Sequence, residues 1–161
     1  MVENKILAVG DKAPDFSLID QDNKIQTLTS QGGKYVVIYF YPKDDTPGCT
    51  KQACGLRDNF NQFSHNNITV FGINYDSPQS HKKFIEKYRL PFTLLSDSNK
   101  EVAKAYGAKN RWFIPVPHRM TFVVNPQGII CAILPSVDVS THASAILEII
   151  ARDQGQIPRR A

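Results

Sequence analysis

The sequence predicts an α/β fold built on a central mixed sheet with helices on both faces. Three observations lead to this prediction. Residues 35–41 form an apolar run, rich in β-branched and aromatic side chains, of the kind found in a strand covered on both sides. Segments with helical signals then alternate with strand-like segments, which favours parallel strands joined by right-handed crossovers. Near the C-terminus, residues 120–124 and 129–134 flank the turn 125–128 and predict an antiparallel hairpin.

The N-terminal half supplies the first elements of this order. Residues 15–20 alternate in part between polar and apolar side chains, and residues 25–28 return as a second strand after a polar turn. An N-terminal β extension is therefore expected. After the central apolar run, Thr46 is a suitable N-cap and Pro47 a suitable first helical residue, so a helix is predicted from there to about Ser64.

The C-terminal half continues the alternation. Its predicted elements are a strand at 68–74, a helix from Ser77-Pro78 to about Tyr88, a short strand at 92–95, a helix at 99–106 with Gly107 as its C-cap, a loop at 108–118, the hairpin, and a last helix from Ser140. The long elements then read β-α-β-α-β-β-α, which is the order of the thioredoxin-like fold. One domain spanning residues 1–161 is expected, because a typical domain has roughly 100–200 residues.

Composition excludes several classes of protein. The chain has 42% hydrophobic and 21% charged residues and a net charge of +4, which is typical of a globular domain and not of a disordered chain. No apolar run approaches the roughly 20 residues that a membrane helix needs. The only basic cluster is Arg159–Arg160, so nucleic-acid binding is a weak alternative. The first residues do not resemble a secretory signal, and three cysteines without framework spacing favour a reducing compartment, hence a cytoplasmic protein.

Cys49 is the strongest candidate for a reactive group. It follows a buried strand and a polar loop and lies in the first turn of the predicted helix. Ligands of open α/β sheets bind beyond the carboxyl ends of the strands, and the positive end of a helix dipole favours a thiolate over a thiol. The alternative is that Cys49 is a small buried apolar residue, as free cysteines usually are. The polar surroundings favour the reactive interpretation.

Cys54 lies five residues later on the same predicted helix and has two interpretations. It is either a core residue beside Ala53 and Leu56 or a resolving thiol that attacks oxidised Cys49. Five helical residues rise about 7.5 Å, beyond the roughly 7 Å between Cα atoms that a disulfide can span. A Cys49–Cys54 disulfide would therefore require local unwinding, and the spacing leaves both interpretations open.

Three further residues are candidates for the same site. Arg119 precedes the strand 120–124, which this topology runs antiparallel to the first strand, so its permanent positive charge is expected near Cys49. The alternative is a surface arginine. Thr46 can cap the helix while its hydroxyl faces the crevice, and Pro42 either ends the strand or shields the thiolate from water.

The remaining candidates are weaker. Cys131 lies in an apolar strand and is expected in the core. No histidine (His65, His81, His118 or His142) shows metal-ligand spacing with the cysteines, so no metal is expected. Asp44, Asp45 and Asp58 are expected to be solvated charges or helix-start acids.

The stretch 42–49, PKDDTPGC, matches the Pro-x-x-x-Thr-x-x-Cys motif of peroxiredoxins. With the extension 50–54, TKQAC, it resembles the peroxiredoxin Q subfamily, also called bacterioferritin comigratory protein. Segments 10–16, 92–97 and 119–124 also resemble parts of this family, so the resemblance covers nearly the whole chain. Gln52 stands where peroxiredoxins broadly carry Glu, although Gln is common in the subfamily. The loop 108–118 departs from the family, being short and rich in proline and aromatic residues.

The resemblance implies a thiol-dependent peroxidase that reduces hydrogen peroxide and organic hydroperoxides. Cys49 would be the peroxidatic cysteine, which becomes a sulfenic acid, and Cys54 the resolving cysteine of an intramolecular disulfide. Thr46 and Arg119 would orient the peroxide and stabilise the thiolate, and Pro42 would shield the site. Thioredoxin or a similar dithiol donor would reduce the disulfide. The family needs no metal, haem or flavin, and its members are monomers or weak homodimers. A disulfide oxidoreductase is the alternative enzyme class, but its Cys-x-x-Cys motif is missing.

Overall fold

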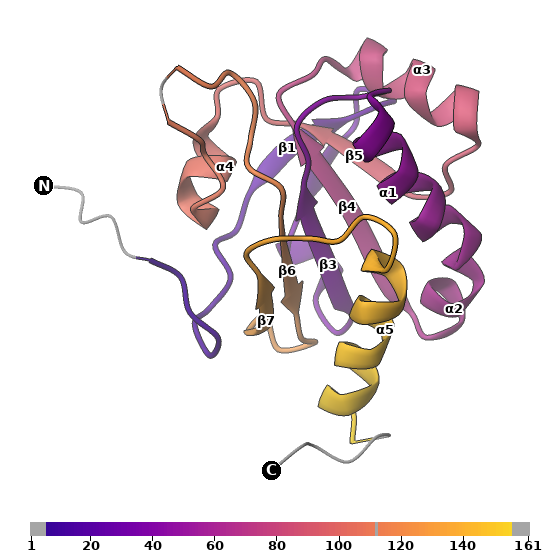
Figure 1. Ribbon diagram of the computed structural model, residues 1–161. Coiled ribbons are helices and arrows are strands. Elements are labelled where there is room, and N and C mark those ends of the chain that lie inside the picture. The colour runs from indigo at the N-terminus through magenta and orange to yellow at the C-terminus, as the bar shows by residue number, and fades with distance from the viewer. Residues whose placement is uncertain (1–5, 112, 156–161) are drawn as a thin grey trace, which may run out of the picture.

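The structure is a computed structural model that describes residues 6–111 and 113–155. A seven-stranded sheet in the order β2-β1-β5-β4-β3-β6-β7 forms its centre (Figure 1). The strands are β1 Ser17–Asp20, β2 Ile25–Thr27, β3 Tyr35–Phe40, β4 Ile68–Asn74, β5 Thr93–Ser96, β6 Met120–Val124 and β7 Ile130–Leu134. Strands β3, β4 and β5 run parallel, whereas β6 runs antiparallel to β3 and to β7. The N-terminal hairpin β1–β2 joins the other edge through an antiparallel pairing with β5. The predicted mixed sheet is confirmed.

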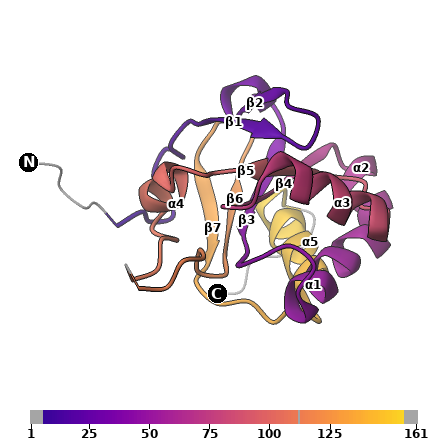
Figure 2. The ribbon, with the colours of Figure 1, turned by 90° about the horizontal axis from the view of Figure 1, so that it is seen from above.

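Helices cover both faces of this sheet. They are α1 Pro47–Asp58, α2 Phe60–His65, α3 Pro78–Tyr88, α4 Glu101–Tyr106 and α5 His142–Asp153, with a short 3-10 turn η1 Thr29–Gln31. Seen from above, α1, α2, α3 and α5 lie on one side of the sheet and α4 lies on the other (Figure 2). This is the thioredoxin-like arrangement that the element order predicts.

Strand β3 is the centre of the core, and all six of its residues are buried. Successive side chains of a strand point to opposite faces. Tyr35, Val37 and Tyr39 belong to the apolar cluster on the side of α1 and α5, while the residues between them belong to the cluster on the side of α4. This double burial explains why the run is apolar without alternation.

The packing of the Tyr39 ring depends on a glycine in β4. A Cβ atom at Gly72 would lie 2.8 Å from the ring of Tyr39 and 2.8 Å from Leu94. The absent side chain therefore leaves the space that the Tyr39 ring fills. Tyr39 stacks at a tilt on Tyr41, with 5.3 Å between ring centroids, and both rings lie under the start of α1.

The first long helix is shorter than predicted. The expected helix to Ser64 is in fact two helices, because Asn59 leaves the helical conformation with φ −105° and ψ 8°. Its side-chain amide donates a 2.8 Å hydrogen bond to the carbonyl oxygen of Gly55. Asparagine side chains compete with the backbone for such bonds, which ends α1 at Asp58.

The two predicted N-caps behave differently. Ser77 caps α3 as expected, since its hydroxyl accepts a 3.1 Å hydrogen bond from the amide of Ser80. Thr46 occupies the N-cap position of α1 but makes no side-chain capping bond, so this part of the prediction is wrong. Its hydroxyl instead donates to the carbonyl oxygen of Lys43 at 2.8 Å, within the loop that leads from β3 to α1.

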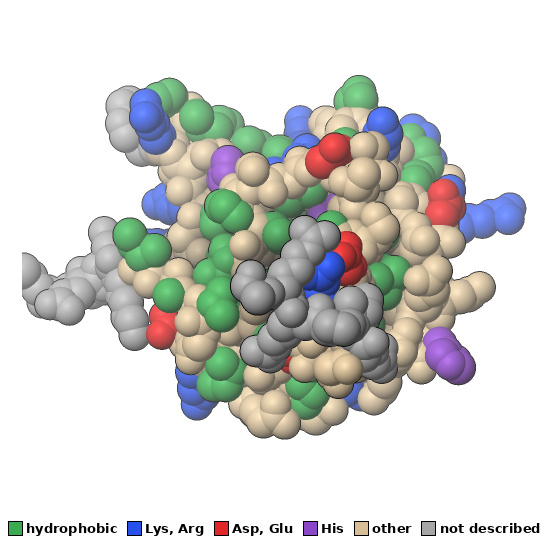
Figure 3. Space-filling view, turned by 60° about the horizontal axis from the view of Figure 1, so that its bottom comes forward, with side chains coloured by type: hydrophobic (Ala, Val, Ile, Leu, Met, Phe, Trp, Pro, Cys, Tyr) green, Lys and Arg blue, Asp and Glu red, His purple; other side chains and the backbone are tan. Residues whose placement is uncertain are grey.

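Basic and acidic side chains are scattered over the face shown in Figure 3 and form no continuous basic patch outside the grey atoms. No helix within residues 6–111 and 113–155 is both long and apolar enough to cross a membrane. The basic pair Arg159–Arg160 and the loop residue Trp112 lie outside the described residues.

Candidate functional site

Cys49 lies in the first turn of α1, just beyond the carboxyl end of β3. Its side chain is buried, with a residue exposure of 1%, and belongs to the same apolar cluster as Tyr39 and Tyr41. The first amide N–H groups of a helix have no partner within the helix and give this end a partial positive charge. Cys49 is thus both packed in the core and placed at the positively polarised end of a helix.

Arg119 reaches the same point from the neighbouring strand. Because β6 pairs antiparallel with β3, with Phe40 opposite Met120, the residue before β6 lies at the edge of the sheet that carries Cys49. The Arg119 guanidinium donates a hydrogen bond from Nη2 to Cys49 Sγ at 3.3 Å. A Cβ atom at Gly48 would lie 3.3 Å from this Nη2, so the glycine leaves room for the guanidinium. Cys49 and Arg119, which the sequence analysis expects near each other, are therefore in direct contact.

A chain of hydrogen bonds continues behind Arg119. Its Nη1 donates to Gln52 Oε1, one turn after Cys49 on α1. Gln52 Nε2 lies 3.2 Å from His142 Nδ1, and His142 Nε2 lies 2.8 Å from Thr121 Oγ1. Gln52 and Thr121 are fully buried, so the chain is shielded from water.

His142 is the first residue of α5 and is almost entirely buried. Burial lowers its pKa, and the positive charge of Arg119 lowers it further, from 6.5 to about 4. His142 is therefore neutral at pH 7. Sequence reasoning placed it among scattered histidines, although its position in the first turn of an amphipathic helix was a usable signal.

Cys54 shares α1 with Cys49 and is half-buried. The helix is continuous between the two residues, and both thiols are unpaired. Helix geometry separates such residues by a rise of about 7.5 Å, which exceeds the span of a disulfide. A disulfide between these two thiols therefore requires α1 to open.

Thr46 and Pro42 lie in the loop between β3 and α1, and both are half-buried. The hydroxyl hydrogen of Thr46 is used in the bond to Lys43, which leaves its oxygen lone pairs unused in the described hydrogen bonds. Neither residue is hydrogen-bonded to Cys49 within the described part of the chain.

Asp44 is buried and is not the solvated charge that the sequence analysis expects. Its side chain is buried and accepts hydrogen bonds from Tyr41, Asn74 and Ser80, and it pairs with His81 Nδ1 at 2.7 Å. Burial alone would raise the pKa of Asp44, but the hydrogen bond and charge of His81 and the bonds from Tyr41 and Ser80 hold this pKa below its ordinary value. No local pattern in the sequence distinguishes this inward-facing acid from a solvated loop acid.

His81 is fully buried on α3, where helical spacing places it on the same face as Phe84. Its Nε2 lies 3.1 Å from the carbonyl oxygen of Leu95, which can only accept. Its Nδ1 faces the Asp44 carboxylate, which also accepts. A hydrogen bond therefore joins Nδ1 of His81 to the Asp44 carboxyl group, and the two side chains form a buried pair.

The other predicted surface acids are exposed, as expected. Asp45 pairs with Lys87 at 2.8 Å, and Asp58 pairs with Arg57 at 3.0 Å. Cys131 on β7 packs against the core as predicted, and burial together with the charge of Asp153 raises its pKa to about 12. Within residues 6–111 and 113–155, no three His, Cys, Asp or Glu side chains gather closely enough to hold a metal ion.

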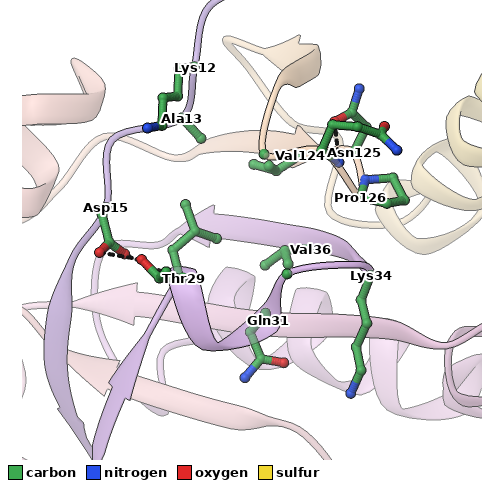
Figure 4. Close-up of a pocket in the computed structure, with 14 residues that line it drawn as sticks. Lys12, Ala13, Asp15, Thr29, Gln31, Lys34, Val36, Val124, Asn125 and Pro126 are labelled. Atoms are coloured by element: carbon green, nitrogen blue, oxygen red, sulfur yellow. Dashed lines mark hydrogen bonds between the residues drawn. The ribbon is translucent and has the colours of Figure 1, made fainter.

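A cavity of about 320 Å³ lies at the opposite end of β3 (Figure 4). Lys34 and Val36, at the start of this strand, and Asn125, in the turn between β6 and β7, contribute to its lining. Neither Cys49 nor Arg119 lines it. The candidate reactive groups, Cys49 and Arg119, therefore lie at the other end of β3 from this cavity.

Comparison with known proteins identifies the family of the chain. Residues 9–133 match the model of the AhpC/TSA family. The chain is 44% identical over 146 residues to a putative peroxiredoxin bcp of Coxiella burnetii, covering 88% of this chain and 97% of that protein. It is 47% identical over 132 residues to a chloroplastic peroxiredoxin Q of Populus jackii, covering 80% of this chain and 62% of that longer protein.

Solved structures show the same likeness. A serine variant of Xylella fastidiosa PrxQ superposes with a TM-score of 0.87 at 29% identity, covering 93% of this chain and 99% of that one. The bacterioferritin comigratory protein of Xanthomonas campestris, studied for its alkyl peroxide reduction activity, gives 0.79 at 30% identity and covers 85% and 91%. The chain therefore belongs to the AhpC/TSA family and is a peroxiredoxin, a thiol-dependent peroxidase, of the group that includes peroxiredoxin Q and the bacterioferritin comigratory proteins.

Proposed function

We propose that the chain, as one domain, reduces hydrogen peroxide and organic hydroperoxides through Cys49. The Cys49 thiolate attacks one peroxide oxygen, the O–O bond breaks, and the other oxygen leaves as water or an alcohol after taking up a proton. Cys49 becomes a sulfenic acid in this step. The observation that supports the proposal is the 3.3 Å contact between the Arg119 guanidinium and Cys49 Sγ at the start of α1.

The surrounding residues have separate parts in this step. Arg119 stabilises the thiolate and then the negative charge that develops on the leaving oxygen. Thr46 has oxygen lone pairs that accept the O–H group of the peroxide, since its own hydrogen is held by Lys43. Pro42 presents an apolar ring at the end of β3 that keeps water and bulk thiols from the sulfur.

The second step uses Cys54. Its thiolate attacks the Cys49 sulfenic sulfur, a disulfide forms, and the sulfenic oxygen leaves as water. The first turns of α1 must unwind for this step, because the continuous helix keeps the two residues too far apart. Gly48 and Gly55 each weaken this helix by about 1 kcal/mol relative to alanine, which lowers the cost of opening. Because α1 ends at Asp58 and α2 is a separate helix, α1 can open while α2 stays in place.

The cycle closes with an external reductant. Thioredoxin or a similar dithiol donor supplies two electrons by thiol–disulfide exchange and returns Cys49 and Cys54 to thiols. The three cysteines of the chain have no framework spacing, which favours a reducing compartment such as the cytoplasm. We further propose that the enzyme acts as a monomer or a weak homodimer, without a metal, haem or flavin.

The disulfide can be tested directly, because Lys51 lies between the two cysteines. The reduced protein is treated with one equivalent of hydrogen peroxide, its free thiols are blocked, and it is digested with trypsin without reductant. We expect peptides 44–51 and 52–57 to appear joined by a disulfide. In Cys54→Ser, we expect one rapid reaction with peroxide and a loss of thioredoxin-dependent recycling of about tenfold or more.

Cys131→Ser is the matched control, because Cys131 is a packed thiol with a raised pKa on the far strand β7. It should leave both the crosslinked peptide and the recycling rate unchanged. A Cys49–Cys131 peptide, or normal recycling in Cys54→Ser, would remove Cys54 from the mechanism while leaving Cys49 as the peroxide-reactive thiol.

The role of Arg119 gives a second test. Arg119→Lys keeps the positive charge but loses the fork that donates to Gln52 Oε1 and Cys49 Sγ together. We expect the rate constant of the first reaction with peroxide, measured in a single turnover, to fall about a hundredfold. Arg111→Lys, at an exposed arginine in the loop 108–118, is the control and should react at the normal rate. An equal rate in both variants would argue against a role for Arg119 in the chemical step.

A further inference from the structure

His142 stands behind the reactive centre and has no part in the steps described above. We propose that His142 is a positioning residue: its unprotonated Nδ1 holds the Gln52 amide in the orientation that offers Oε1 to Arg119. Arg119 is thereby kept on Cys49. This inference deepens the proposed function and rests on it, since the quantity affected is the reactivity of Cys49 with peroxide.

The direction of every hydrogen bond in the chain follows from Arg119. A guanidinium only donates, so the atom of Gln52 that it contacts must be the oxygen. The other end of the amide is then the NH₂ group, which donates to His142 Nδ1 across 3.2 Å. Nδ1 must be without a proton, and the neutral ring carries its hydrogen on Nε2, which donates to Thr121 Oγ1 at 2.8 Å.

The surrounding fold fixes the histidine ring in this position. His142 begins α5, Gln52 lies on α1 and Thr121 lies on β6, so the chain of bonds joins three elements around Cys49. The ring of His142 also packs edge-on against Tyr39, with centroids 5.8 Å apart and planes at 71°. Tyr39 is itself fully buried, which leaves the imidazole little freedom to turn.

Removing the Nδ1 acceptor releases the amide. The Gln52 side chain can then rotate so that its NH₂ group, instead of Oε1, faces the Arg119 guanidinium. Both groups are donors, so the hydrogen bond between them is lost. The Arg119 side chain loses its anchor on α1 and shifts from Cys49 Sγ. A misplacement of about 1 Å in a catalytic group can cost on the order of a hundredfold in rate.

The kinetic test compares His142→Leu with His142→Asn. Leucine fills the site but accepts no hydrogen bond, whereas the smaller asparagine has an oxygen near the position of Nδ1. We expect the single-turnover rate constant with hydrogen peroxide to fall about tenfold to a hundredfold in His142→Leu, and to be at least partly restored in His142→Asn. His65→Leu, at an exposed histidine that ends α2, is the control and should react normally. A role in packing alone predicts the opposite order, because leucine fills the space better.

A second measurement needs no peroxide. Nitrogen-15 NMR of the full chain at pH 7 should show His142 as a neutral ring protonated on Nε2. In Gln52→Glu, one carboxylate oxygen faces Arg119 and the other faces Nδ1 of His142. Because both oxygens only accept hydrogen bonds, Nδ1 should gain a proton. A proton on Nδ1 in the unaltered protein would overturn the proposal, as would unchanged reactivity in His142→Leu or equal losses in both His142 variants. If the protein failed to react with peroxide at all, the NMR result would still decide the hydrogen-bond direction, so the two failures are distinguishable.

Discussion

Replacing Cys49 by serine is expected to abolish peroxide turnover, with a loss of at least about a thousandfold. A serine hydroxyl is not ionised near neutral pH and is a far weaker nucleophile than a thiolate toward the O–O bond. Serine fits the site with little change in volume and can still accept the hydrogen bond from Arg119 Nη2. The loss should therefore come from chemistry and not from unfolding. Peroxide consumption with a thioredoxin system measures the effect, and the thermal unfolding temperature confirms that the variant is folded.

Two comparisons make this experiment specific. Cys131→Ser removes the other core-packed thiol and should retain full turnover, since burial keeps that thiol protonated. Cys54→Ser should keep the first reaction with peroxide. Turnover that persists in Cys49→Ser, or that disappears only when Cys131 is replaced, would contradict the assignment of Cys49 as the peroxidatic thiol.

The second large effect is expected at the buried pair of Asp44 and His81. His81→Leu leaves the buried Asp44 carboxylate without this partner, and removing the partner of a buried charge destabilises a folded protein by about 3–5 kcal/mol. For a domain of this size, such a loss should lower the unfolding temperature by about 6–20 °C. Urea unfolding at pH 7 measures the change in the free energy of unfolding.

The exposed pair of Asp45 and Lys87 is the matched control, because it lies beside Asp44 in the same loop. Asp45→Asn should change the free energy of unfolding far less than His81→Leu does, since solvent screens exposed pairs. Replacing both Asp44 and His81 by leucine should recover much of the loss, because apolar side chains can substitute for a buried ion pair. A loss in His81→Leu no larger than that in Asp45→Asn would show that the pair does not stabilise the fold.

The effect of pH on this pair has a definite sign. The pKa of Asp44 in the folded state lies below its ordinary value of 3.8, so the carboxylate form favours folding. This stabilisation is present above about pH 4 and is lost as the pH falls through the lower folded-state pKa. The difference in stability between the unaltered protein and His81→Leu should therefore shrink on acidification.

Local patterns in the sequence predicted most of the fold. The unbroken apolar run of β3 reflects a strand buried on both faces, and the confirmed cap Ser77 and the left-handed Gly107, with φ +76°, depend only on neighbouring backbone atoms. Cys49 was predictable for the same reason, because a helix start after a buried strand is a local feature. The position of Arg119 near Cys49 was predictable because β6 runs antiparallel to β3.

What the sequence left open depends on partners distant in the chain. Asp44 is buried because its neighbours come from α3 and β4, 30 or more residues away, and a solvated loop acid has the same local pattern. Thr46 does not cap α1 because its hydroxyl is used within the loop.

The amino-acid sequence by itself determined the order of the elements, the family and the two thiols, because each is encoded in short-range patterns and in a contiguous motif. Only the tertiary structure decided which ionisable side chains near these thiols are buried and which donors and acceptors they contact. The neutral form of His142 follows from which donors and acceptors face its ring after α1, α5 and β6 have packed together. Burial removes the water that would otherwise satisfy either form, so the packed neighbours select the proton positions.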